Sequence, residues 1–176
     1  MKNVIAAVHS DKDFELALES GVEMIFDLSP NIMSLEEKVK KAHLNNKKIF
    51  IHIDLAEGIG KDRFGILHAK ELGIDGVIST RTGLIKAAKE TGVSTVQRFF
   101  MVDSQSIDTT LKTLNISKPD MIEVMPGTVK KIILRLKSQI SMPIIAGGLI
   151  ESKEEADEAY SSGAIAISTG KKDLWN

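Results

Sequence analysis

The sequence predicts an α/β protein built from eight strand-helix units. Short β-branched runs alternate with longer amphipathic helical patterns along all 176 residues, without a linker or a low-complexity break. Such alternation gives parallel strands with right-handed crossovers, and a parallel sheet must be covered on both faces or closed. Eight units of about 22 residues favour closure with short loops, since a usual eight-fold barrel has roughly 250 residues. We therefore expect a compact (β/α)8 barrel of the TIM type, with an open doubly wound sheet as the alternative.

The predicted strands are the eight β-branched runs. They span Val4 to Val8, Val22 to Leu28, Lys48 to Ile53, Gly76 to Ser79, Ser94 to Arg98, Met121 to Val124, Pro143 to Ala146 and Ala164 to Ser168.

Glycines end several of the helical patterns, as expected for left-handed helix ends. The patterns and their glycines are Asp11 to Ser20 before Gly21, Lys61 to Leu72 before Gly73, Thr82 to Thr91 before Gly92, and Ser152 to Ser162 before Gly163. Ser34 has Glu37 three residues later, which predicts a capping box at the start of the second helix.

Composition indicates one domain spanning residues 1–176. Hydrophobic residues make up 43% and charged residues 27%, as in average globular proteins. Cysteine is absent, which excludes disulfides, thiolate nucleophiles and cysteine metal sites. No window has the roughly 18 apolar residues of a membrane span, and the N-terminus becomes polar too early for a signal peptide, so we expect a cytoplasmic protein.

Alternation within the strands predicts which side chains point into the barrel. Ile49, Ile51 and Ile53 alternate with Phe50, His52 and Asp54, and a similar alternation places Glu123 opposite the isoleucine and valine of its strand. The β-branched set should face the helices. His52, Asp54 and Glu123 should then face the interior near the carboxyl-terminal mouth, where barrel sites are built.

The two late loops predict a phosphate site. Gly147 and Gly148 follow the seventh strand, and Ser168, Thr169 and Gly170 end the eighth. Glycines let backbone amides approach a phosphate, and a short helix near Lys171 would add its N-terminal dipole. The alternative is that these glycines only turn the chain.

Polar residues at other strand ends form a candidate ligand wall. The residues are His52, Asp54, Ser79, Arg81, Arg98 and Glu123. The arginines would clamp an anion or neutralise the carboxylates, and the carboxylates would accept bonds from ligand hydroxyls. The alternative is a structural layer of ion pairs. Asp27, Asp54 and Glu123 would have to meet to bind a divalent ion, and we predict no metal site and no cofactor.

Read together, these motifs resemble the glycerol-3-phosphate-responsive antiterminator family, regulators of glycerol uptake operons. The motifs are HIDLAEGIG, DGVISTR, VQRFFMVDS, PDMIEVMPG, PIIAGG and GAIAISTGKKDLW, and the block from the sixth strand to Trp175 is specific as a set. The first strand, VIAAVHS, departs from the family pattern, which has a proline there.

The resemblance implies a regulator that binds glycerol-3-phosphate and acts on leader RNA to prevent premature transcription termination. It assigns no catalytic residue, and it puts the phosphate at the two late loops with the polar wall around the ligand. The competing interpretation is a small phosphosugar isomerase, epimerase or lyase with Glu123 as general base and His52 as acid. No lysine at a strand end supports a Schiff base.

RNA binding would need local basic patches, because 23 basic and 24 acidic residues give a net charge of −1. One candidate patch contains Lys130, Lys131, Arg135 and Lys137, and another contains Lys38, Lys40, Lys41, Lys47 and Lys48. The alternative is that both are solvated helix faces balanced by nearby acids. A homodimer would join two patches into one basic surface.

Overall fold

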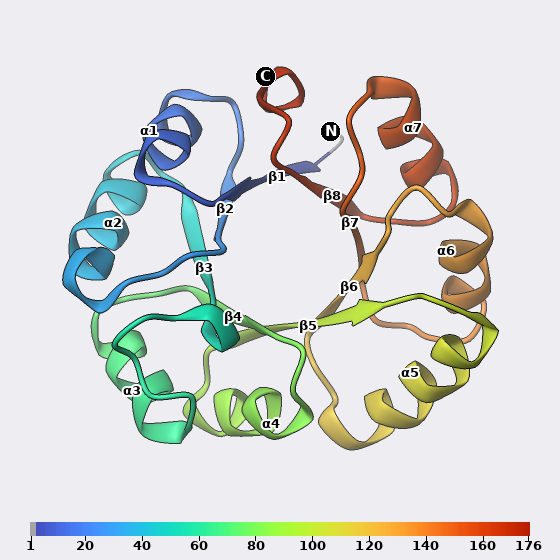
Figure 1. Cartoon of the computed structure of the whole chain (residues 1–176), viewed down its shortest axis with the longest axis horizontal. Coiled ribbons are helices and arrows are strands. Elements are labelled where there is room, and N and C mark those ends of the chain that lie inside the picture. The colour runs from blue at the N-terminus through green and yellow to red at the C-terminus, as the bar shows by residue number, and fades with distance from the viewer. Residues whose placement is uncertain (1–2) are drawn as a thin grey trace.

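The computed structural model describes residues 3–176 and confirms the predicted closed barrel. Its strands are β1 (Asn3–Val8), β2 (Met24–Asp27), β3 (Lys48–His52), β4 (Gly76–Ser79), β5 (Ser94–Phe100), β6 (Met121–Met125), β7 (Ile144–Gly147) and β8 (Ala166–Thr169). All neighbours pair in parallel, and β1 also pairs with β8, which closes the ring. Figure 1 shows this ring of strands with the helices around it.

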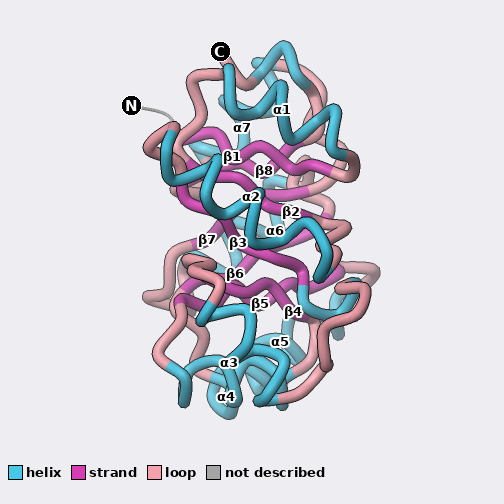
Figure 2. Tube along the Cα trace, turned by 90° about the vertical axis from the view of Figure 1, so that its left-hand side faces the viewer, coloured by secondary structure: helices cyan, strands magenta, loops and turns pink. Residues whose placement is uncertain are grey.

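Helices follow the first seven strands, and a short 3-10 turn follows the eighth. They are α1 (Asp11–Glu19), α2 (Ile32–Leu44), α3 (Arg63–Glu71), α4 (Thr82–Thr91), α5 (Ser104–Ser117), α6 (Lys130–Lys137) and α7 (Lys153–Ser161), with 3-10 turns η1 (Ile53–Leu55) and η2 (Lys172–Leu174). Figure 2 shows the strands running through the middle of the molecule between the helices. None of the helices among residues 3–176 is long and apolar enough to cross a membrane.

The strands separate an inner from an outer apolar core, as their alternation predicts. Ile49, Ile51 and Ile53 pack outward with the helices. The interior is filled by a different set, in which the rings of Phe26 and Phe50 lie 5.8 Å apart. These large side chains fill the middle of the barrel, and cavities of about 290 and 750 Å³ lie at its carboxyl-terminal and amino-terminal ends.

The start of α2 differs from the prediction. Asn31 is the N-cap, and its side chain accepts a hydrogen bond from the backbone amide of Met33. Ser34 lies in the first turn, where its hydroxyl donates to the carbonyl of Asn31. The predicted Ser34 and Glu37 capping box was therefore wrong, because the asparagine three residues earlier satisfies the helix end.

The glycines that end helices are of two kinds. Gly73, Gly92 and Gly163 have positive φ angles of 97°, 78° and 110°, which confirms left-handed helix ends. Gly21 is not among the positive-φ glycines of the described residues, so the left-handed prediction there was wrong. Its amide instead donates to the carbonyl of Trp175, which joins the end of α1 to the C-terminus.

Most strand and helix limits differ from the predicted ones by one to three residues. The main consequence concerns Asp54, which we expected to extend the alternation of the third strand. The strand ends at His52, and Asp54 lies in the 3-10 turn η1. The Asp54 side chain accepts hydrogen bonds there from the Ser79 hydroxyl and the Thr80 amide at the end of β4.

Candidate functional site

A cavity of about 290 Å³ lies at the carboxyl-terminal mouth of the barrel. Its wall combines the late loops with part of the predicted polar wall. The predicted residues that line it are Arg98, Glu123, Gly148, Ser168, Thr169 and Gly170. The volume is at the low end of the roughly 300–1,000 Å³ typical of ligand pockets, so it suits a small ligand.

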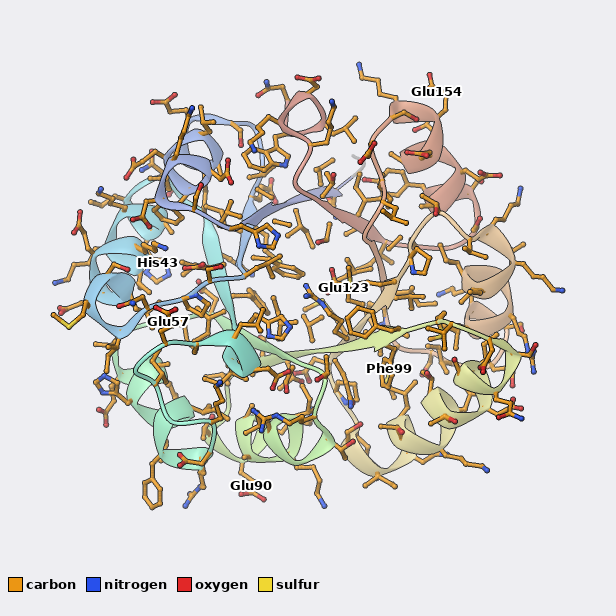
Figure 3. All side chains as sticks on the ribbon, viewed as in Figure 1. His43, Glu57, Glu90, Phe99, Glu123 and Glu154 are labelled. Carbon is orange, nitrogen blue, oxygen red and sulfur yellow. The ribbon has the colours of Figure 1, made fainter. Side chains whose placement is uncertain are left out.

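Arg98 and Glu123 form the charged part of this wall. They lie opposite each other on β5 and β6, and the Arg98 Nε donates to the Glu123 Oε2 at 2.6 Å. Arg98 is 7% exposed and Glu123 is fully buried. Figure 3 shows Glu123 inside the ring of strands, whereas Glu90 and Glu154 lie on the outer helices. This ion pair brings one cation to the wall of the cavity.

Gly147 and Gly148 lie in different surroundings. A Cβ on Gly147 would stand 2.4 Å from the Glu123 Oε1, so this glycine leaves room for the buried carboxylate and is not part of the cavity lining. Gly148 lines the cavity and has a φ of +72°. Leu149 follows with a φ of +60°, which is unusual for leucine, and also lines the cavity.

The end of β8 is held by a network around Thr169. Its hydroxyl donates to the carbonyl of Ile150 at 2.7 Å and accepts from the amide of Lys171 at 3.0 Å. The indole of Trp175 donates to the carbonyl of Thr169 at 2.9 Å. The Thr169 side chain therefore fixes the loops of β7 and β8 to each other. Ser168 and Gly170 complete this side of the cavity.

The polar residues of β3 and β4 form a separate network outside the cavity lining. The Asp54 carboxylate accepts from the Ser79 hydroxyl at 2.8 Å, from the Thr80 amide at 2.7 Å and from the Arg81 Nε at 2.9 Å. Burial raises the pKa of Asp54, but these hydrogen bonds outweigh it and hold the pKa below the ordinary 3.8. Three of the predicted wall residues are thus bonded to one another.

His52 is buried beside the Asp54 network. Its Nδ1 lies 3.8 Å from the Asp54 Oδ2, too far for a hydrogen bond, and has no hydrogen-bond partner among residues 3–176. Burial, together with the positive charge of Arg98, lowers the pKa of His52 to about 4, although Asp54 opposes this. The imidazole is therefore neutral at pH 7.

The three carboxylates considered for a divalent ion are each paired with a different cation. Asp27 binds Lys38 at 3.1 Å, Asp54 binds Arg81, and Glu123 binds Arg98. In the part of the chain that the structure describes, no group of three His, Cys, Asp or Glu side chains is placed to hold a metal ion.

The cavity also contains residues that the sequence analysis did not assign to a site. These are Ala7, Leu28, Met125, Leu149, Ile150 and Glu151, and the cavity is also lined by His9 and Lys171, which follow the first and the eighth predicted strands. The alternation of β1 and β2 predicts inward positions for Ala7 and Leu28. No sequence signal predicts the exposed Leu149, since leucine seldom adopts a left-handed backbone.

The two candidate basic patches differ in how their charges are used. On α2, Lys38, Lys40 and Lys41 form ion pairs with acidic residues. Lys47 is buried, and its amino group donates to the carbonyls of Ser20 and Val22. This patch is therefore largely neutralised.

On α6, Lys130 and Lys131 are exposed and form no ion pair within residues 3–176. Arg135 contacts the Asp108 carboxylate at 3.3 Å, and both side chains are partly exposed. The α6 patch consequently keeps positive charge that is free to meet a polyanion.

Comparison with known proteins shows the family. The fold and the mouth cavity define a (β/α)8 barrel protein, and the sequence profile of the glycerol-3-phosphate responsive antiterminators matches residues 4–175. The chain belongs to this family, as the motif resemblance predicts. The family is a regulatory one.

Relatives from three bacteria support this assignment. A glycerol uptake operon antiterminator regulatory protein from Listeria monocytogenes is 35% identical, with a TM-score of 0.92 and 98% and 94% of the two chains covered. A glycerol uptake operon antiterminator-related protein from Thermotoga maritima is 30% identical, with a TM-score of 0.88 and 99% and 98% covered. The uncharacterized protein YgcP of Escherichia coli is 37% identical over 173 residues, 98% of this chain and 91% of that protein.

Aldolase structures also match, at 12% to 16% identity. At this level of identity they show the shared barrel alone.

Proposed function

We propose that this chain senses glycerol-3-phosphate in the mouth cavity and, when it is bound, acts on leader RNA to prevent premature transcription termination of glycerol genes. The observation that carries the proposal is the cavity itself, where Gly148, Ser168 and Gly170 face the same space as Arg98. Glycine-rich backbone and a guanidinium together suit a phosphate monoester. The family description supports this ligand.

The ligand is sensed rather than converted. In the enzyme alternative His52 would be the acid, but a neutral imidazole with a pKa of about 4 is a poor proton donor at pH 7. His52 also lies outside the lining of the cavity. The proposal includes no cofactor, so prior treatment with a chelator should leave the affinity unchanged.

Calorimetry with glycerol-3-phosphate, followed by long incubation and product analysis, tests this part of the proposal. We expect binding without conversion. Turnover of glycerol-3-phosphate or of a triose phosphate would instead establish the isomerase, epimerase or lyase alternative.

The RNA contact is proposed to lie on α6. Lys130 and Lys131 are exposed at its start, and Arg135 is one turn further on. Because the net charge is −1, the contact must depend on this local charge, and a homodimer would present two such patches to one RNA. We expect weak RNA binding without ligand and tighter binding with it.

A leader RNA titration with and without glycerol-3-phosphate tests the contact. Replacing Lys130, Lys131 and Arg135 together with glutamine should weaken binding and reduce its dependence on salt. The matched control replaces Lys86, Lys112 and Lys153, which are exposed on other helices, and changes the net charge equally. Equal losses in both variants, or no binding at low salt, would remove the RNA function.

A further inference from the structure

One oxygen of the Glu123 carboxylate has no hydrogen-bond partner in the described part of the chain. The Oε2 accepts from the Arg98 Nε, but the Oε1 is buried and unpaired among residues 3–176. An ionised oxygen removed from water without a donor is costly, so native proteins seldom retain one without a function. The structure therefore lacks a donor at this point.

The unpaired oxygen lies beside the proposed phosphate loop. A Cβ on Gly147 would stand 2.4 Å from it, which places the oxygen against the backbone immediately before Gly148. Glu123 and Gly148 both belong to the lining of the mouth cavity. A ligand whose phosphate contacts Gly148 would thus bring its nearest carbons toward the Arg98 and Glu123 pair.

Arg98 supplies the complementary group. Of the three nitrogens of its guanidinium, only the Nε has a hydrogen-bond partner among residues 3–176, so the two terminal nitrogens keep their donors. A ligand hydroxyl can accept from Arg98 and donate to the Glu123 Oε1 at the same time. A carbonyl can only accept, and it would set its lone pairs against those of the carboxylate.

We infer that Glu123 makes the cavity selective for a phosphorylated polyol with a hydroxyl at C2 over the keto triose phosphate of the same size. This inference rests on the proposed function and specifies the hydroxyl that is recognised. The phosphate ester carbon adjoins the Gly148 loop, so the next carbon, C2 of glycerol-3-phosphate, carries the hydroxyl that meets Glu123. Arg98 binds either oxygen, and Glu123 distinguishes them.

Calorimetry of the unmodified protein with three phosphate esters tests the inference without any substitution. Glycerol-3-phosphate has the C2 hydroxyl, dihydroxyacetone phosphate has a carbonyl there, and 3-hydroxypropyl phosphate has no oxygen at that carbon. We expect glycerol-3-phosphate to bind at least about 10-fold more tightly than the other two, because only it satisfies the buried oxygen.

The substitution Glu123→Gln identifies the residue responsible. The glutamine oxygen can still accept from Arg98, while its amide group offers a donor in place of the acceptor. The preference for glycerol-3-phosphate over dihydroxyacetone phosphate should fall to about one or reverse. Glu154→Gln makes the same chemical change at an exposed position of α7, outside the cavity lining, and should retain the preference.

The outcomes separate this inference from the proposed function. Equal affinity of the unmodified protein for all three esters would overturn the selectivity and leave the sensor intact. An equal loss for all three esters in Glu123→Gln would show that Glu123 only maintains the structure, and would also overturn the inference. Absence of binding by all three would overturn the proposed function and the inference together.

Discussion

Two adjacent positions, Gly147 and Gly148, require glycine for different reasons. Gly147 makes room for the Glu123 carboxylate, whereas Gly148 has a left-handed backbone and a Cβ on it would stand 2.7 Å from the Met125 Cε. A side chain at Gly148 therefore disturbs both the loop and the cavity wall. The Gly-Gly pattern in the sequence indicates a closely approached backbone, but it does not identify the neighbouring side chains, which are Glu123 and Met125.

We predict that Gly148→Val abolishes glycerol-3-phosphate binding and lowers the free energy of unfolding by about 1–3 kcal/mol. The loss has two parts, backbone strain at a φ of +72° and contact with Met125. Calorimetry measures the affinity for glycerol-3-phosphate, and denaturant unfolding measures the free energy of unfolding. Gly83→Ala is the control, because a Cβ there meets nothing within 4 Å and a helical alanine should stabilise by about 0.5–1 kcal/mol. Full affinity in Gly148→Val would contradict the loop site.

The lowered pKa of His52 predicts how the free energy of unfolding depends on pH. Its pKa is about 4 in the folded protein and 6.5 when unfolded, so only the unfolded chain binds a proton between these values. The contribution of the neutral His52 to the free energy of unfolding is fully present above pH 6.5. It is lost as the pH falls toward 4, and the free energy of unfolding then decreases by at most about 1.4 kcal/mol per pH unit.

Denaturant unfolding at pH 4.5 to 7.5 checks this expectation. The variant His52→Gln should have a smaller slope than the unmodified protein, and the exposed His68→Gln provides the matched control. An unchanged slope in His52→Gln would show that the buried imidazole is not the group responsible.

At the scale of elements, the helix N-caps determine where the loops at the mouth end and the helices begin. Asn31 caps α2 and also donates from its side chain to the Glu57 carboxylate at 2.9 Å, so it joins the loops after β2 and β3. Asp103 and Ser152 start α5 and α7 with capping boxes. The Ser34 and Glu37 pattern has the same residue types as the capping box of α7, but Ser34 already lies inside α2.

We predict that Asn31→Ala lowers the free energy of unfolding by about 1 kcal/mol, since it removes the cap of α2. Ser34→Ala should change it by less than about 0.5 kcal/mol, because Ser34 bonds only to a carbonyl of its own helix. Thermal and denaturant unfolding of the pair compare the two positions directly. A larger loss for Ser34→Ala would reinstate the capping box that the sequence pattern indicates.

At the scale of the whole molecule, closure of the barrel brings distant strand ends to one cavity. The lining comes from both the beginning of the chain, at Ala7 and Leu28, and its end, at Lys171. Pairing of β1 with β8 joins these ends. A ligand held there contacts loops that are separated by most of the sequence, so it should stabilise the fold as a unit.

We predict that glycerol-3-phosphate at 100 times its Kd raises the free energy of unfolding by about 2.7 kcal/mol. Thermal unfolding with increasing ligand measures this as a rising Tm. Gly148→Val should show no rise, and inorganic phosphate should need a far higher concentration. A Tm that is independent of ligand in the unmodified protein would contradict the sensor.

The local pattern of the chain determines most of the fold. Period-two alternation sends Ile49 and Ile51 outward and Phe50 inward because neighbouring residues of a strand point to opposite faces. Eight such strands joined by helices can satisfy their edges by closing, and the motif order also indicates the family. These features depend on near neighbours in sequence, so the sequence alone determines them.

Tertiary structure decided which polar residues share a site. The sequence pattern treats Asp54 and Glu123 alike, as inward carboxylates near the mouth. Asp54 is bonded to Ser79 and Arg81, whereas one oxygen of Glu123, which lines the cavity, has no partner among residues 3–176. The lysines of α2 and α6 likewise look similar in sequence, yet only those of α2 meet carboxylates. The physical reason is that hydrogen bonds and ion pairs depend on the distance between side chains from different units. Those distances exist only once the barrel has closed.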